Sequence, residues 1–246
     1  SIHLLRAEVP GPVVGKLVPK IRQTARILYI IYIAITLIEV ILLLLGGMNL
    51  FESLVHAFGT AGTGGFGVKN DSIASYNSYL QWVLTIFMLL FGVNFNLYYF
   101  ILIKKAKVAL KSTELWFYLG IIAFSTICVT ANIFPIYETL GTSIKHAAFQ
   151  VAAFVTTTGY GTATVNDWPI FSKTLLFLLM FVGGCAGSTA GGFKLARVMM
   201  LLKNAKRELQ RLLHPRSVSV VRFEGKRVDD VTVNSVSAYL TIYTLF

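Results

Sequence analysis

Four long apolar segments restrict this chain to a small set of folds. They cover about residues 27–46, 79–103, 115–135 and 171–201, and a fifth begins near Val231. About 20 residues of helix, at 1.5 Å per residue, cross the hydrocarbon core of a bilayer. Only 13% of the residues are charged and the mean hydropathy is +0.69, whereas about a quarter of residues are charged in soluble domains. The sequence therefore predicts a multi-pass membrane protein.

The basic residues predict how the chain is oriented. Nineteen of the 22 Lys and Arg residues lie before the first segment, after the second, or in and after the end of the fourth. Because consecutive spans alternate in direction, these groups face one side, which the positive-inside rule makes cytoplasmic. The net charge of +11 is thus interpreted as an orientation signal, and no nucleic-acid partner is expected. The groups are Arg6, Lys16, Lys20, Arg22 and Arg26; Lys104, Lys105, Lys107 and Lys111; and ten residues from Lys194 to Arg227.

Two polar, glycine-rich stretches lie between apolar segments on the predicted outer side, GTGGFG at 62–67 and TTTGYG at 156–161. Each follows an apolar stretch of about 12 to 18 residues, which as a helix reaches only part of the way through the membrane. Unpaired backbone at that depth is tolerated where it is buried in protein or lines a water-filled cavity. An offset of 94 residues aligns the two stretches together with their flanking segments, which indicates an internal repeat.

We therefore predict an all-α polytopic membrane protein of repeated span–pore-helix–filter-loop–span units, which resemble potassium-channel pore modules. The first unit is expected at 27–111 and the second, with a broken last helix, at 112–213. A cytoplasmic basic lead-in, 1–26, precedes them, and a cytoplasmic linker and the truncated start of a further unit, 214–246, follow. The start at Ser1 and the end inside an apolar run suggest a piece of a longer protein.

The glycine-rich stretches can form an ion filter. Backbone carbonyls that point at a common axis replace the water around a dehydrated cation, and glycine permits the positive φ that turns successive carbonyls the same way. We expect Tyr160 and Phe66 to pack outward and the threonines at 156–158 to anchor the strand to the preceding helix. The expected filter residues are Thr63, Gly64, Gly65, Phe66, Thr157, Thr158, Gly159 and Tyr160, with K⁺ at Thr63, Gly65, Thr157 and Gly159.

The sequence GGCAGSTAGG interrupts the fourth apolar segment. Each of its five glycines costs a helix about 1 kcal/mol relative to Ala. Two interpretations remain open: close helix packing through small residues, or an unwound loop inside the membrane that blocks or opens the path below the filter. In the second, Ser188 and Thr189 would hold the closed position through bonds to neighbouring helices. The interruption comprises Gly183, Gly184, Cys185, Ala186, Gly187, Ser188, Thr189, Ala190, Gly191 and Gly192.

Other polar residues in or near the apolar segments allow a structural or a functional interpretation. Two linker acids either are solvated or concentrate cations at the mouth, and two mid-segment asparagines either join helices or line a vestibule. An intramembrane acid is a functional candidate by default, although a helix-packing role is as plausible. The two histidines and two cysteines are expected to pack rather than bind metal. These residues are Asp71, Asp167, Asn94, Asn96, Glu39, His56, His146, Cys128 and Cys185.

No arrangement of residues typical of an enzyme is present in the sequence, so an enzyme is not expected. GTGGFG matches G-x-G-x-x-G, but it lies in a membrane linker without the following acid that a dinucleotide fold needs. No cofactor is therefore expected, and K⁺ is the expected transported ion. A Na⁺-selective or weakly selective cation path, or a non-conducting structural or assembly subunit, are the alternatives.

The chain resembles the membrane subunit of the Trk/Ktr potassium-uptake family, within the superfamily of K⁺ transporters. The matching motifs are RAEVPGP at 6–12, HAFGTAGTGGFG at 56–67, TTTGYGTATVNDWP at 156–169 and GGCAGSTAGGFKLAR at 183–197. The resemblance implies four units around one pore with one filter glycine each, here Gly65 and Gly159, and a gating role for the interruption. It also implies a cytosolic ring of nucleotide-binding regulatory subunits. We expect a homodimer in the bilayer of the plasma membrane, the bacterial inner membrane.

Overall fold

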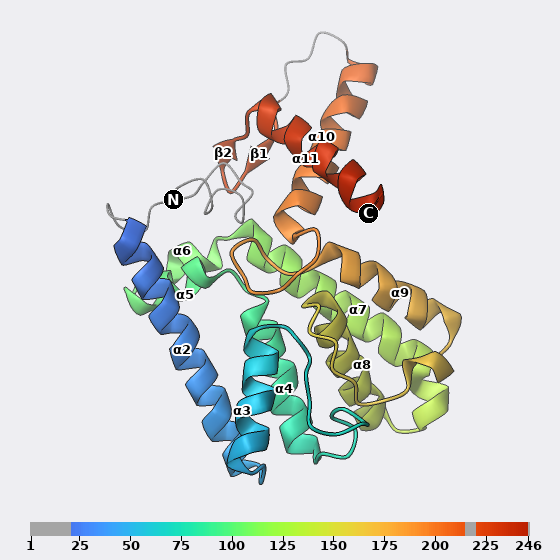
Figure 1. Ribbon diagram of the computed structural model, residues 1–246. Helices are drawn as coiled ribbons and strands as arrows, with labels where there is room; N and C mark the ends of the chain where they lie inside the picture. The colour runs from blue at the N-terminus through green and yellow to red at the C-terminus, as the bar shows by residue number, and fades with distance from the viewer. Residues whose placement is uncertain (1–20, 215–219, 246) are drawn as a thin grey trace.

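The computed structural model describes residues 21–214 and 220–245. The motif at 6–12 and most of the predicted lead-in lie outside these residues. The described chain is mostly helical, and its helices α2 to α9 form one body, from which α10, α11 and a small hairpin project at one end (Figure 1).

Within the described residues, two helices are individually long and apolar enough to cross a membrane, α2 (Ile21–Leu45) and α7 (Thr113–Tyr137). Helix α2 exposes large apolar side chains along its length, including Tyr29, Ile38 and Leu45, which suits a surface that faces lipid or further protein. The Ser112 side chain accepts a hydrogen bond from Leu115 N and so caps the start of α7. Pro135 lies within the last turn of this helix.

Two shorter helices precede the glycine turns, α3 (Leu50–Ala61) and α8 (Leu140–Val155). The Asn49 side chain accepts from Glu52 N and begins α3. Helix α3 packs against α2 and α4 (Ser78–Phe91), and α8 packs against α4, α7 and α9 (Ile170–Val182). A short 3₁₀ helix, η1 (Val165–Asp167), lies in the linker after the second turn.

The apolar segment predicted at 79–103 is not one continuous helix. Helix α4 ends at Phe91, and α5 (Phe95–Leu102) leaves at an angle of 92° to it. Gly92 caps the end of α4, and the Asn94 side chain accepts from Asn96 N to start α5. An N-capping asparagine satisfies a free backbone donor at a helix start, so these residues end one helix and begin another. The short helix α6 (Ala106–Leu110) follows.

The fourth apolar segment is also divided into two helices, as the sequence predicts. Helix α9 ends at Val182, and α10 (Leu195–Leu213) begins after a loop at 183–194. The strands β1 (Arg222–Phe223) and β2 (Lys226–Arg227) then form a hairpin inside the predicted linker, before α11 (Asp230–Leu245). Glu224 and Gly225 both have positive φ, as the favoured two-residue hairpin turns require.

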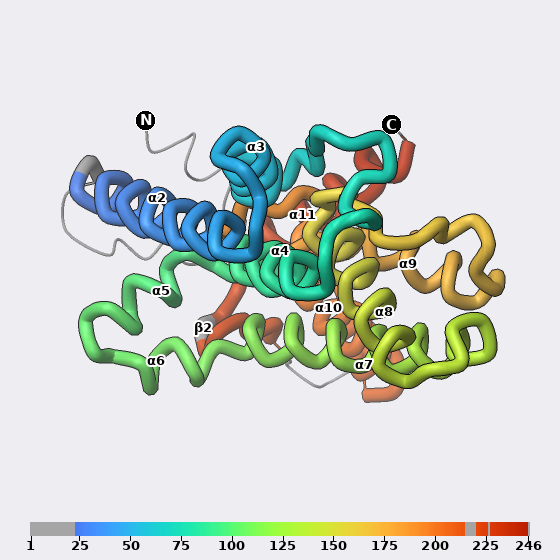
Figure 2. The backbone as a smooth tube through the Cα atoms, turned by 90° about the horizontal axis from the view of Figure 1, so that it is seen from below, coloured from blue at the N-terminus to red at the C-terminus, as the bar shows by residue number. Residues whose placement is uncertain are grey.

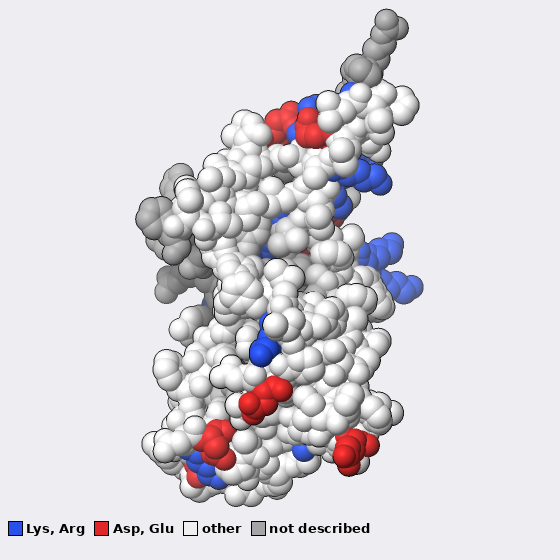
Figure 3. Space-filling view, turned by 90° about the vertical axis from the view of Figure 1, so that its right-hand side faces the viewer, with Lys and Arg blue, Asp and Glu red and all other residues white. Residues whose placement is uncertain are grey.

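Two buried apolar clusters lie in the body of the molecule. One joins α2, α3, α4 and α8, with Leu43, Phe91 and Phe149 fully buried, and the other joins α7, α8 and α9. Figure 2 shows α2, α5 and α6 on one side, α9 on the other, and α4 between them. Figure 3 shows a different face, the right-hand side of the view in Figure 1, on which most of the Lys and Arg lie toward the end that carries α10 and α11.

Candidate functional site

The two glycine-rich turns share an unusual backbone. Thr63 and Gly65 have φ values of 49° and 65°, and Thr157 and Gly159 have φ values of 55° and 85°. Each pair encloses one residue of ordinary φ. Positive φ costs a residue with a side chain roughly 1–2 kcal/mol, so the two threonines are held there by their surroundings. Alternation of this kind can turn carbonyl groups toward one side of the strand.

The hydrogen bonds that tie each turn to its short helix also recur. Three backbone bonds in the first turn have counterparts in the second at an offset of 94 residues. They are Gly62 N to Phe58 O (2.9 Å) and Thr156 N to Ala152 O (3.1 Å), Thr63 N to Thr60 O and Thr157 N to Phe154 O (both 3.1 Å), and Gly65 N to Gly59 O and Gly159 N to Ala153 O (both 3.2 Å).

The two turns lie side by side. A Cβ atom added to Gly65 would come within 2.1 Å of the Thr158 carbonyl oxygen, so only glycine fits there. The Tyr160 hydroxyl, buried behind the turns, lies 3.1 Å from the carbonyl oxygens of both His56 and Phe66. The second turn is therefore fastened to the first turn and to its helix.

The side chains of the second turn are internal and that of Phe66 is not. The Thr156 hydroxyl donates to Ala152 O at 2.7 Å and lies 2.8 Å from the Thr158 hydroxyl, which anchors the strand to α8. Tyr160 is fully buried. Phe66, in contrast, is 75% exposed. Within the described chain it therefore does not pack as expected.

The interruption of the fourth segment is an ordered loop that fits into the break between α4 and α5. Cys185 N donates to Gly92 O at 2.9 Å, and Phe95 N donates to Gly187 O at 3.1 Å. The Thr189 hydroxyl lies 3.3 Å from Phe91 O. The carbonyl and amide groups that the broken helix leaves unpaired are thus satisfied by the loop, as buried backbone requires.

The loop at 183–192 also touches both glycine turns. The Thr63 hydroxyl donates to Thr189 O at 3.2 Å, and Gly191 N donates to the Thr157 hydroxyl at 2.8 Å. Thr63 and Thr157 occupy the same place in the two turns. The structure therefore brings the predicted filter and the predicted gate together at two equivalent residues.

One expectation about this loop needs correction. Ser188 does not bond to a neighbouring helix, because its hydroxyl donates to Cys185 O within the loop at 2.6 Å. Lys194, the first residue of the third basic group, is half-buried, and its ammonium group donates to the carbonyl oxygens of Ser188 and Ala190. With φ of 74° it starts α10 and turns its charge back into the loop.

The other polar residues singled out in the sequence are dispersed. Asp71 and Asp167 are exposed in the two linkers. Glu39 is fully buried in α2, and both of its carboxyl oxygens lack a hydrogen-bond partner among the described residues. His56 and His146 bond to Glu52 O and to the Thr162 hydroxyl, respectively. Both cysteines are free thiols.

Two acids that belong to the site were not predicted from the sequence. The Glu114 side chain, 4% exposed at the start of α7, accepts a hydrogen bond from Ala186 N at 2.7 Å. Glu224 in the hairpin turn accepts from Glu114 N at 3.0 Å. An acid in the first turn after Ser112 is a recognisable helix-start pattern, but nothing local indicates that it reaches the loop 72 residues away.

These features define a mostly helical protein with helices apolar enough to cross a membrane, in which two shorter helices end in paired glycine turns beside an ordered loop. The family model TrkH, described as cation transport protein, matches residues 1–124 and 100–246. The chain therefore belongs to the TrkH family of cation transport proteins.

Individual relatives agree with this assignment. The chain is 33% identical over 250 residues to the Trk system potassium uptake protein TrkH of Salmonella typhimurium, and 36% identical over 249 residues to the TrkG protein of Escherichia coli. The aligned regions cover 100% and 99% of this chain, and 52% and 51% of those two proteins, respectively. The crystal structure of the potassium transporter TrkH from Vibrio parahaemolyticus superimposes with a TM-score of 0.89 at 30% identity, over 99% of this chain and 53% of that one. The chain thus spans about half the length of these relatives.

Proposed function

We propose that this chain forms part of a path for K⁺ across the membrane, with a carbonyl-lined filter and an intramembrane gating loop. The observation that carries the proposal is the pair of adjacent glycine turns with positive φ at Thr63, Gly65, Thr157 and Gly159. Carbonyl oxygens presented in this way replace the hydration shell of a cation. The names of the relatives, potassium uptake proteins, support K⁺ as the ion.

The half-length helices suit this role. Helices α3 and α8 end directly at the two turns, and the C-terminal end of a helix carries a partial negative charge of about half an electron. Both helices thus favour a cation at the turns. Two filter glycines would come from the units at 27–111 and 112–213 and the others from the rest of a longer protein in the bacterial cytoplasmic membrane.

The loop at 183–192 has the contacts that a gate needs. It touches an equivalent threonine in each turn and is continuous with α10, which leads out of the membrane-embedded body toward the hairpin (Figure 1). A segment with two discrete arrangements can be biased by a ligand that binds elsewhere. Movement of α10 would therefore be transmitted to the loop beside the filter.

Flux measurements on the full-length protein in liposomes test the proposed function. A K⁺ flux at least about tenfold larger than the Na⁺ flux is expected, since tenfold corresponds to about 1.4 kcal/mol of discrimination. Equal fluxes would favour a weakly selective cation path. The absence of flux for either ion, in protein that is folded and inserted, would favour a structural subunit.

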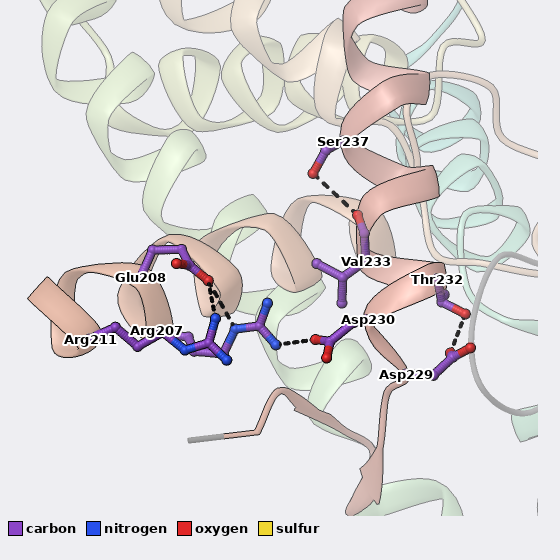
Figure 4. A network of polar contacts seen from close by, with 8 residues as sticks. All are labelled: Arg207, Glu208, Arg211, Asp229, Asp230, Thr232, Val233 and Ser237. Carbon is purple, nitrogen blue, oxygen red and sulfur yellow. Dashed lines mark hydrogen bonds and ion pairs between the residues drawn. The ribbon is translucent and has the colours of Figure 1, made fainter. Parts of the chain in front are cut away.

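A cytosolic nucleotide-binding regulatory subunit is the proposed partner, and the structure changes which basic residues are available to it. Arg207 is 8% exposed, and it forms ion pairs with Glu208 and with Asp230 of α11 (Figure 4). The hydrogen bond and charge of Arg207 hold the pKa of Asp230 below its ordinary value, so the pair persists at neutral pH and is lost only in acid. Arg207 therefore joins α10 to α11 and is a poor choice for a partner contact. Lys206 and Arg211 are exposed.

Lys206→Glu combined with Arg211→Glu is expected to reduce co-purification of the regulatory subunit at least several-fold, because it reverses two exposed charges on α10. Lys107→Glu with Lys111→Glu is the matched control, since it makes the same charge change at exposed positions on and after α6. Recovery of the same amount of complex from the α10 variant and from wild type at ordinary salt would exclude α10 as the contact. An equal loss in both variants would indicate a general charge effect.

A further inference from the structure

The hairpin turn is joined to the membrane loop by a short series of hydrogen bonds. The Glu224 carboxylate accepts from the Ser112 hydroxyl and from Glu114 N, both at 3.0 Å. Glu114 in turn accepts from Ala186 N at 2.7 Å. One residue, Glu114, thus uses its backbone to contact the hairpin and its side chain to contact the loop.

The surroundings of these hydrogen bonds make them stronger than ordinary surface contacts. Backbone N–H groups at the start of α7 have no partner within the helix, and the helix dipole favours a negative charge there. Glu224 supplies that charge from 110 residues away. The Glu224 carboxylate is a charged acceptor, which makes shorter and stronger hydrogen bonds than a neutral one, and the contact between Glu114 and Ala186 is buried.

A second, apolar contact joins the same parts of the molecule. Ala186 belongs to a buried cluster with Val221 and Phe223 of the hairpin segment. The cluster also includes Met200 of α10 and Val233 of α11. Displacement of the hairpin would therefore expose apolar surface next to the loop. It would also break the hydrogen bond between Glu114 N and the Glu224 carboxylate. Both effects act on the same residue of the loop, Ala186.

We propose that the hairpin at 222–227 is a latch for the loop, in which Glu224 and Glu114 are positioning residues. With the hairpin seated, Glu224 fixes the start of α7, and the Glu114 carboxylate holds Ala186 and hence the loop against the break between α4 and α5. Unseating the hairpin removes one hydrogen bond from Glu114 and opens the cluster around Ala186. This inference rests on the proposed gating role of the loop.

Glu224→Ala is the principal test, made in the full-length protein without the regulatory subunit. The variant removes both bonds to the start of α7, and Gly225 retains the turn. We expect hydrogen exchange of the peptide that covers 183–192 to become about tenfold faster, the effect of losing one bond to a charged group. K⁺ flux into liposomes is expected to rise by a similar factor. Glu224→Gln, which keeps the accepting oxygen, should restore most of the slow exchange.

The controls separate this proposal from the gating role on which it rests. Glu208→Ala removes an exposed acid of α10 whose ion pairs within the described chain are with Arg207 and Arg211, and wild-type exchange is expected in 183–192. Unchanged exchange in folded Glu224→Ala protein would overturn the latch, whatever the flux. Faster exchange without any change in flux would support the contact but contradict its role in gating.

Discussion

Gly159→Ser is expected to reduce the preference for K⁺ over Na⁺ by at least about tenfold, a change of about 1.4 kcal/mol in relative ion affinity. Gly159 has φ of 85°, a conformation that costs a residue with a side chain roughly 1–2 kcal/mol. Relaxation of that strain would rotate the neighbouring carbonyls away from the ion. Nothing lies within 4 Å of an added Cβ atom, so the protein should still fold. Paired K⁺ and Na⁺ flux measurements in liposomes check the result.

Gly161→Ser provides the matched control. Gly161 lies two residues further on, has no positive φ, and would place an added Cβ no closer than 3.8 Å to another atom. The same substitution there should leave selectivity unchanged. Equal selectivity in Gly159→Ser, Gly161→Ser and wild-type protein would contradict the assignment of this turn to the filter.

Gly65 should respond differently from Gly159, although the two occupy the same place in their turns. An added Cβ at Gly65 would lie 2.1 Å from the Thr158 carbonyl oxygen and would force the two turns apart. Gly65→Ser is therefore expected to reduce the yield of folded protein as well as selectivity. Thermal unfolding in detergent distinguishes the two glycines.

Deletion of 186–190 is expected to raise K⁺ flux about tenfold and to reduce its dependence on the regulatory subunit, within the usual range of coupling free energies of 1–3 kcal/mol. The deletion removes Thr189, which contacts Thr63, and Ala186, which contacts Glu114. It also removes the contacts of Gly187 and Thr189 with the break between α4 and α5. Flux with and without the regulatory subunit is the measurement.

The structure explains why α9 and α10 should remain connected after the deletion. The two ends of the loop touch, because an added Cβ at Gly183 would lie 2.3 Å from Gly191 O. Phe193 N donates to Phe181 O, and Leu195 N donates to Gly184 O, both at 3.0 Å. α9 and α10 thus remain joined at the base of the loop. A folded deletion protein with wild-type flux and regulation would leave helix packing as the role of the segment.

The sequence by itself determined the features that depend on composition and local backbone chemistry. Long apolar runs require a membrane, since about 20 such residues cross the hydrocarbon core. Glycines in a polar turn, as at Gly65 and Gly159, indicate positive φ, and five glycines in ten residues do not favour a continuous helix. The short helices, the turns and the divided fourth segment were predicted for these reasons.

Tertiary structure alone decided which of these segments meet. The break at Gly92 was not predicted, because one glycine and Asn94 in an apolar run are compatible with a continuous helix until the loop at 183–192 supplies partners for the freed backbone groups. Glu114 looks like an ordinary helix-start acid, and Glu224 like a linker residue. Their roles depend on hydrogen bonds across 72 and 110 residues, and pairing over such distances depends on the whole fold rather than on a pattern in the neighbouring sequence.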